Sequence, residues 1–160
     1  MFGDFYGDES ILVTGHTGFK GAWLSLWLRE LGARVHGFSI GTVGRPSFYE
    51  TLGKKLFESD ARGDVRDLGA LKKLIRRTKP RMIFHLAAQP LVRRSYQEPL
   101  ETLTTNALGT ANVLEAVRLT GCAASIIVVT TDKCYENRNL KRGYREADPL
   151  GGHDVYSASK

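Results

Sequence analysis

The sequence predicts an α/β domain built on a doubly wound parallel sheet. Short, uniformly apolar runs alternate with stretches in which apolar residues recur at helical spacing. Strands that are apolar throughout are typical of a parallel sheet that is covered on both faces. Alternating strands and helices then wind around the sheet through right-handed crossovers. The 160 residues are enough for one domain with a sizeable core.

The first elements follow from short local patterns. Residues 11–14 form an apolar strand, and the apolar residues after it repeat at helical spacing up to Gly32, which suits the position just beyond a helix end. Residues 34–38 form the second strand. Residues 41–59 contain a proline and several glycines, so we expect irregular structure there. A short strand then leads into Gly63.

The later elements are read in the same way. The apolar residues from Leu68 onwards predict a helix that stops before Pro80. Residues 81–88 and 125–131 are continuous apolar strands, and residues 100–120 form a long helix between them. The sequence stops inside the first turns of a further helix. We therefore expect residues 1–160 to be an incomplete cofactor-binding domain, cut before a C-terminal substrate domain.

Composition argues against several classes of protein. Hydrophobic residues make up 42% and charged residues 25%, as in ordinary soluble domains. The net charge of +6 is spread along the chain, which favours an anionic small molecule over nucleic acid. No apolar run approaches the roughly 20 residues that cross a membrane. Cys122 and Cys134 lack metal-ligand spacing, so we expect no metal site and reduced thiols in the cytoplasm.

Three glycines lie at the mouth of the first helix. Gly15 suits a tight turn after the strand, and Gly18 lets the backbone approach a pyrophosphate with no Cβ in the way. Gly21 lets the helix pack close to the sheet. The N–H groups that begin the helix then face the phosphates. This pattern predicts a cradle for a dinucleotide.

The end of the second strand bears on the choice of dinucleotide. Sites that prefer NAD often place Asp or Glu there, bonded to the ribose hydroxyls. Here the residue is Ser39, which neither binds the diol as a carboxylate would nor repels a 2′-phosphate. Arg45 lies nearby in sequence and could accept such a phosphate. The residues alone leave NAD and NADP open.

A tyrosine and a lysine lie four residues apart near the end of the sequence. Tyr156 and Lys160 fall on one face of the expected helix. A free phenol has a pKa near 10 and is a poor base at neutral pH. A neighbouring ammonium favours the phenolate, which can exchange a proton with a substrate hydroxyl.

The spacing Gly-x-x-Gly-x-x-Gly together with Tyr-x-x-x-Lys resembles the extended short-chain dehydrogenase/reductase family, which includes NAD-dependent epimerases and dehydratases. The resemblance implies a Rossmann-type fold, NAD as cofactor and a homodimer or higher homo-oligomer. It extends to "GDVRD", "HLAAQP" and "NALGT". It implies cofactor contacts at Gly15, Thr17, Gly18, Phe19, Lys20, Gly21, Ser39, Asp64, Val65, Leu86, Ala87, Ala88, Gln89, Asn106, Tyr156 and Lys160. His85, within the second of these segments, we interpret as a core histidine with satisfied hydrogen bonds.

The segment "TTDKCY" follows the last apolar strand. In sugar-nucleotide dehydratases of this family, a Thr-Asp-Glu triplet lies here, and the present chain has Thr131, Asp132 and Lys133. The resemblance is to the branch that dehydrates CDP-glucose. It implies that Thr131 bonds the sugar O4 and that Asp132 protonates the leaving C6 hydroxyl. Lys133 is either the base for the C5 proton or an electrostatic or cofactor contact, in which case the base lies elsewhere.

Two other interpretations stay open. A nucleotide-sugar 4-epimerase, or a 4,6-dehydratase for another nucleotide sugar, would share the glycine cradle, Tyr156 and Lys160. An epimerase would need no acid at Asp132. A degenerate module that only senses a nucleotide is disfavoured because Thr131, Tyr156 and Lys160 are all present.

Overall fold

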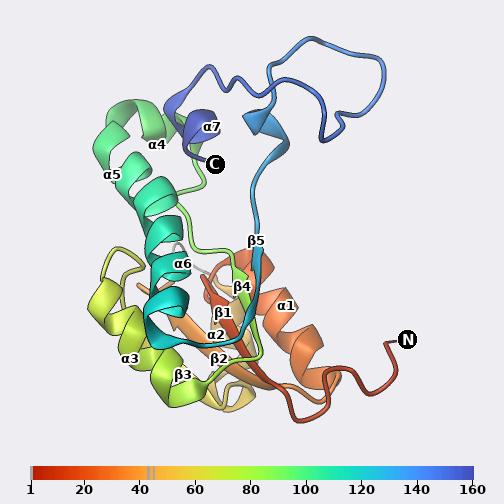
Figure 1. The fold of residues 1–160 in the computed structure, drawn as a ribbon, viewed down its shortest axis with the longest axis vertical. Helices are drawn as coiled ribbons and strands as arrows, with labels where there is room; N and C mark the ends of the chain where they lie inside the picture. Colours follow the sequence, from red (N-terminus) through yellow and green to blue (C-terminus); the bar gives the residue numbers. More distant parts are fainter. Residues whose placement is uncertain (1, 43, 45) are drawn as a thin grey trace.

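The structure is a computed structural model that describes residues 2–42, 44 and 46–160. Its centre is a parallel five-stranded sheet, as the sequence predicts, and its strands lie in the order β3-β2-β1-β4-β5. The first strand therefore lies in the middle, and the chain adds strands first on one side and then on the other (Figure 1). The strands are β1 (Ser10–Thr14), β2 (Arg34–Ser39), β3 (Ser59–Arg62), β4 (Met82–His85) and β5 (Ser125–Val128).

Helices cover both faces of this sheet. In Figure 1, α1 lies on one face, and α3 and α6 lie together on the other. A π-helical turn, Thr104–Leu108, joins α5 to α6, and short 3₁₀ turns occupy Lys54–Leu56 and Asp132–Cys134. The helices are α1 (Phe19–Glu30), α2 (Phe48–Leu52), α3 (Leu68–Thr78), α4 (Val92–Gln97), α5 (Pro99–Leu103), α6 (Gly109–Thr120) and α7 (Val155–Ser159).

Strand β1 is the centre of the core because its alternate residues serve both layers. Leu12 packs with the residues of α3 and α6, whereas Ile11 and Val13 pack with those of α1 and α2. All three side chains are completely buried. Full burial of one such side chain contributes about 1.5 to 3 kcal/mol. The strand therefore fixes where the two helical layers sit relative to the sheet edge.

The strands β4 and β5 are shorter than the sequence predicts. Residues 81–88 were expected to be one strand, but β4 ends at His85, which pairs with Thr14 of β1. One residue further on, Leu86 N donates to Thr14 O at 3.2 Å, and the chain then leaves the sheet. Residues 125–131 were likewise expected to be extended throughout, but β5 ends at Val128. Strands that stop at the same level leave the following residues free to form loops along the carboxyl edge of the sheet.

Two further expectations are wrong. Residues 41–59 are not irregular throughout, because α2 and a 3₁₀ turn form there around aromatic residues. Phe48 stacks on Trp23 with ring centroids 4.1 Å apart, and Tyr49 is buried. Strand β5 is also not covered on both faces, since Ile127 is 45% exposed at the sheet edge.

The long helix expected at residues 100–120 is present, but it is preceded by the separate helix α4. The break falls at Glu98, because a residue before proline is pushed away from helical torsions. Pro99 then begins α5 at a position where its missing N–H costs nothing. The helix ends at Gly121, whose φ of +65° is the left-handed conformation expected there.

Candidate dinucleotide and catalytic site

The glycine turn is built by close approach of backbone to backbone. Gly15 has φ +73°, and its N–H donates to the Phe38 carbonyl at 2.8 Å. A Cβ at Gly15 would lie 2.7 Å from the Ala87 nitrogen. Only glycine combines this torsion with this contact. The turn after β1 is therefore pressed directly against the segment that follows β4.

Gly21 and Gly18 have different tasks within the same turn. A Cβ at Gly21 would lie 2.2 Å from Gly15 O, so this glycine lets the helix approach the turn directly. Gly18 is exposed at the N-cap of α1. A Cβ at Gly18 would lie 3.3 Å from its nearest neighbour, Gly15 O. Phe19 and Lys20 follow in the exposed first turn.

This geometry fits the phosphates of a dinucleotide. The first N–H groups of a helix have no acceptor within the helix and carry a partial positive charge. The N-cap of α1 is a glycine without a side-chain cap, so no side chain competes for those groups. Gly15 and Gly21 allow the backbone of the turn to pack closely against its neighbours. Gly18 is the exposed glycine of the turn and is the one that can face the phosphates.

Thr17 ties the glycine turn to the end of β2. Its hydroxyl lies 2.7 Å from the Ser39 hydroxyl and donates to the Gly41 carbonyl. Ser39 is 7% exposed and therefore acts as a structural partner of the turn. Arg45, which the sequence offered as a phosphate ligand, lies outside the described residues.

A buried polar network beside this turn was not found from sequence. His16 Nε2 lies 2.8 Å from Asp60 Oδ1, and Asp60 also accepts from the Tyr49 hydroxyl. Arg62 donates to Asp60 at 2.8 Å and to the Tyr49 hydroxyl at 2.6 Å. The sequence feature that could have indicated this network is Gly37, a glycine inside a strand, which often marks the close approach of another group. A Cβ at Gly37 would lie 2.4 Å from the His16 ring.

The charges of this network are set by its surroundings. Burial lowers the pKa of His16, against the opposing pull of Asp60. The pKa of Asp60 is also lowered: burial acts to raise it, but the hydrogen bonds from Tyr49 and His16 and the charges of His16 and Arg62 outweigh that effect. The network joins the glycine turn and α2 to β3.

Asp64 and Val65 lie after β3, as expected, and both already have local partners. Asp64 accepts from the Arg66 backbone at 2.8 Å and from Arg66 Nε at 2.9 Å, and these contacts lower the pKa of the Asp64 carboxyl. Val65 is buried, and its carbonyl accepts from Asn112 on α6. Asp67 caps α3 by accepting from the Ala70 N–H at 2.9 Å.

The segment after β4 is held by Asn106. The Asn106 side chain accepts from Gln89 N at 2.8 Å and donates to Gln89 O at 3.1 Å. It also donates to Ser159 Oγ in α7 at 2.8 Å. Leu86, Ala87 and Ala88 lie along the same segment. Asn106 therefore joins the predicted cofactor-lining segment to the helix that carries Tyr156.

Thr131, Asp132 and Lys133 lie in a 3₁₀ turn just beyond the end of β5. The Thr131 hydroxyl accepts from Lys133 N at 3.3 Å and lies 3.3 Å from Asp132 Oδ1. Asp132 and Lys133 are exposed and line a cavity of about 260 Å³. This turn is in the region where parallel α/β folds bind ligands.

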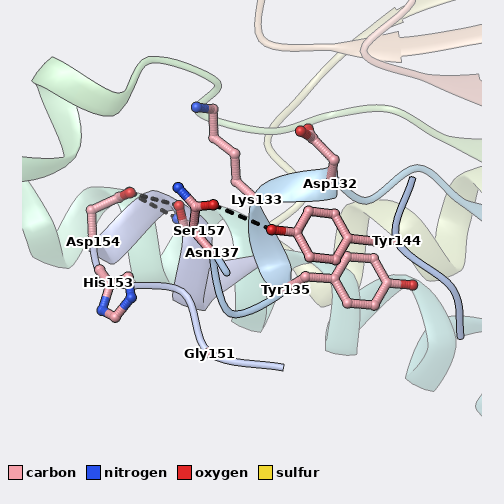
Figure 2. A pocket seen from close by; sticks show the side chains of 9 residues that line it. All are labelled: Asp132, Lys133, Tyr135, Asn137, Tyr144, Gly151, His153, Asp154 and Ser157. Carbon is pink, nitrogen blue, oxygen red and sulfur yellow. Dashed lines mark hydrogen bonds between the residues drawn. The ribbon is translucent and has the colours of Figure 1, made fainter. Parts of the chain in front are cut away.

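Residues of the loop that leads to α7 line the rest of the cavity. In Figure 2, Tyr135 and Tyr144 stack face to face, with ring centroids 5.1 Å apart. The Tyr144 hydroxyl donates to Asn137 at 3.2 Å. Ser157 lines the cavity from α7, so the segments after β5 and before α7 share one wall.

Lys160 follows α7 and lines a second cavity, of about 550 Å³. Its Nζ donates to the Val129 carbonyl at 2.7 Å, just past the end of β5. Burial, and then the charge of Lys20, lower the pKa of the Lys160 ammonium. Ser157 lines both cavities, whereas Thr131 and Tyr156 line neither.

Five parallel strands in this order, with a glycine turn after the central strand, define an α/β domain of the Rossmann type. The chain belongs to the family described as GDP-mannose 4,6 dehydratase, whose model matches residues 12–160. No helix in the described part of the chain is long and apolar enough to span a bilayer.

Individual relatives narrow this similarity. The chain is 48% identical over 158 residues to a CDP-glucose 4,6-dehydratase of Salmonella typhimurium, covering 98% of this chain and 44% of that relative. Among solved structures, a UDP-Glc/GlcNAc 4-epimerase from Campylobacter jejuni matches with a TM-score of 0.84 at 26% identity, over 96% of this chain and 46% of its own. A Thermus thermophilus UDP-glucose 4-epimerase in complex with NAD matches with a TM-score of 0.77 at 26% identity. The match covers 94% of this chain and 47% of the epimerase chain. The chain thus spans about half the length of these relatives.

Proposed function

We propose that this chain is the cofactor-binding part of an NAD-dependent nucleotide-sugar 4,6-dehydratase that converts CDP-glucose to CDP-4-keto-6-deoxyglucose in deoxysugar biosynthesis. The observation that carries the proposal is the turn after β5, where Asp132 and Lys133 line a cavity together with Ser157 of α7. An acid and a cation beside the Tyr156 helix suit a dehydration better than an epimerisation. The 48% identity to a CDP-glucose 4,6-dehydratase supports the choice of sugar nucleotide.

The residues of the cradle would hold NAD by its phosphates and adenosine. Gly18 and the N–H groups that begin α1 would meet the pyrophosphate, and Ala87 would line the opposite wall. Bound NAD supplies a site that accepts hydride from the sugar C4 and returns it to C6. The NAD complex of a relative that shares the fold at 26% identity supports this cofactor.

Tyr156 and Lys160 would handle the proton at the sugar O4. Tyr156 as phenolate takes the proton when the C4 hydroxyl is oxidised to a ketone. Lys160 is fixed by its bond to the Val129 carbonyl, so its position does not depend on substrate.

Thr131, Asp132 and Lys133 would carry the elimination of water. Thr131 would bond the sugar O4, and Asp132 would protonate the C6 hydroxyl so that it leaves as water. The 4-ketone makes the C5 proton acidic. A base other than Lys133 would accept that proton, and the Lys133 side chain would stabilise the negative charge that its loss creates.

Assembly and location complete the proposal. Leu100, Leu103, Leu108 and Leu114 are exposed along α5, the π turn and α6, which supports pairing of two copies through these helices. We place the enzyme in the cytoplasm, which suits the two free thiols Cys122 and Cys134.

The test is an isotope experiment on the full-length protein. It is incubated with CDP-glucose in heavy water without added cofactor, and the product is weighed by mass spectrometry. We expect loss of water with one deuterium retained at C5. Asp132→Asn should lower this turnover by about 10² to 10⁴-fold, whereas Glu146→Gln, an exposed carboxylate in the same loop, should leave it unchanged.

Three results would contradict parts of the proposal. An unchanged mass with a new isomer on chromatography would indicate an epimerase and would remove the role of Asp132. Water loss only from another nucleotide sugar would overturn CDP-glucose and keep the mechanism. Activity that depends on added NADP and not on NAD would overturn the cofactor.

A further inference from the structure

A chain of hydrogen bonds crosses the carboxyl edge of the sheet and passes through His85. Thr14 Oγ1 at the end of β1 lies 2.7 Å from His85 Nδ1, and His85 Nε2 lies 3.0 Å from Thr110 Oγ1 on α6. His85 is 2% exposed. It bonds neighbours on both sides, and the proposed reaction gives it no proton to carry.

The neighbouring bonds fix the direction of every proton in this chain. Thr110 Oγ1 donates to Asn106 O at 2.6 Å, so it is free only to accept from His85. His85 Nε2 must therefore carry the hydrogen, and Nδ1 must accept from Thr14. Thr14 Oγ1 in turn accepts from Ala87 N at 3.2 Å. One neutral tautomer of His85 satisfies all four bonds.

The two ends of this chain are the two halves of the candidate site. At one end, Thr14 precedes Gly15, and Ala87 is the residue against which Gly15 is pressed. At the other end, Asn106 holds Gln89 and, through Ser159, the helix α7. The side chain of His85 thus spans from the glycine cradle to the helix of the Tyr–Lys pair.

A second connection runs through the backbone of His85. Val129 N donates to His85 O at 3.0 Å, and the Val129 carbonyl accepts from Lys160 Nζ at 2.7 Å. Burial, and then the charge of Lys160, lower the pKa of His85 to about 4, so the ring is neutral at physiological pH. A neutral ring is the form that the hydrogen bonds require.

We propose that His85 is a positioning residue that sets the distance between the dinucleotide cradle and the Tyr156–Lys160 pair. It acts through Thr14 and Ala87 on one side and through Thr110 and Asn106 on the other. This inference rests on the proposed function, because it assigns His85 to the alignment of that site. A residue that only filled space in the core would not need the hydrogen bonds that His85 forms on both sides of its ring.

The first test reads the tautomer without any activity. Long-range ¹H–¹⁵N spectra of the full-length protein distinguish Nε2–H from Nδ1–H histidines, and His85→Phe identifies the signal by its loss. We expect His85 to be the neutral Nε2–H tautomer at pH 7. A charged ring would overturn the proposal, because Nδ1 could then not accept from Thr14. The Nδ1–H tautomer would also overturn it, because Nε2 could then not donate to Thr110.

The second test separates positioning from simple packing. His85→Phe fills the space and removes both bonds, and Thr110→Val keeps the shape of threonine without its hydroxyl. We expect each to lower kcat and to weaken NAD binding by about tenfold to a hundredfold, since small displacements of a site have effects of this size. The KM for the sugar nucleotide should stay within about twofold, because its contacts are not altered.

Two matched controls make the test decisive. Thr110→Ser restores the hydroxyl and should recover most of the loss. His36→Phe removes another buried histidine, which bonds Ser59 on the neighbouring strand at 2.8 Å, away from the chain of bonds. If His36→Phe loses as much kcat and NAD affinity as His85→Phe, or if Thr110→Val loses neither, His85 is only a packing residue.

The outcomes also separate this inference from the proposed function. If the unsubstituted protein does not turn over CDP-glucose, the proposed function is overturned. The NAD affinities measured by calorimetry, together with the tautomer, then still decide the role of His85.

Discussion

The glycine cradle and the segment between β5 and α7 lie at the same edge of the sheet, but they are built differently. In the cradle, Gly15 and Gly21 allow backbone atoms to approach where a Cβ would collide, and β1 beneath them is fully buried. After β5, Asp132 and Lys133 are exposed, and the loop is held by separate hydrogen bonds such as Gly151 N to Cys134 O at 2.9 Å.

This difference separates two kinds of rigidity. Steric exclusion between backbones cannot be relaxed without moving a strand, so the cradle is one unit with the core. A loop held by individual hydrogen bonds and ion pairs can change one contact at a time. We infer that the fold fixes the glycine cradle and leaves the loop between β5 and α7 adjustable. Under the proposed function these are the cofactor side and the substrate side.

The largest expected effect comes from breaking the cradle at Gly21. Gly21→Ala places a Cβ 2.2 Å from Gly15 O, where both partners are backbone and cannot rotate away. We expect the free energy of unfolding to fall by about 3 kcal/mol, the upper end of the usual cost of overpacking, because neither backbone segment can move aside. Urea denaturation followed by circular dichroism measures this change.

Gly18→Ala is the matched control for that substitution. Its nearest neighbour would be Gly15 O at 3.3 Å, and the position is exposed. We expect a much smaller loss of stability and a clear loss of NAD affinity by calorimetry. Equal destabilisation by both substitutions would show that the two glycines do not have separate tasks.

The next effect concerns pH and the junction of the two regions at His85. Its pKa is about 4 in the folded protein and near 6.5 when unfolded, so the unfolded chain binds a proton first as pH falls. Stability should therefore fall from pH 6.5 to about 4 and stop falling from this cause below that. The loss is about 3 kcal/mol for a single group with this shift.

His85→Leu isolates this contribution from other titrating groups. The variant should be less stable at pH 7.5, but its stability should fall less steeply between pH 6.5 and 4 than that of the unsubstituted protein. Chemical denaturation at a series of pH values gives both slopes. Parallel slopes would mean that His85 does not stay neutral in the folded state.

A smaller effect is expected at the start of α3, outside both regions. Asp67→Ala removes the side chain that accepts from Ala70 N at 2.9 Å. Loss of such a cap costs about 1 kcal/mol. Asp67→Asn keeps an acceptor and should retain most of the stability, and thermal unfolding of the three proteins measures the difference. If Asp67→Asn and Asp67→Ala are equally stable, the cap does not contribute.

The comparison also explains what could be predicted from sequence. Glycine spacing and the helical repeat of apolar residues from Leu68 act over a few residues, so the turn and α3 follow from local pattern. The parallel sheet follows from the alternation of strands and helices. These features are local or general, and the structure confirms them.

The features that sequence did not predict depend on distant partners. The His16 network needs Asp60 and Tyr49, which lie more than thirty positions away in the chain. The ends of β4 and β5 are set by where their neighbours stop, so a uniformly apolar run overestimates their length. The direction of protons around His85 likewise required Asn106 and Thr110 in place.

The smallest expected effect lies in the loop before α7. Arg142 forms two hydrogen bonds to Asp148, at 2.8 and 2.7 Å, and they lower the pKa of the Asp148 carboxyl to about 2. Asp148 also accepts from Arg145 N at 2.7 Å. Arg142→Gln should leave the global stability unchanged, since an exposed ion pair contributes little. The Arg145 amide should nevertheless exchange with solvent faster, which hydrogen exchange measures. A fall in global stability would show instead that this loop unfolds together with the core, and the distinction between a rigid cofactor side and an adjustable substrate side would be lost.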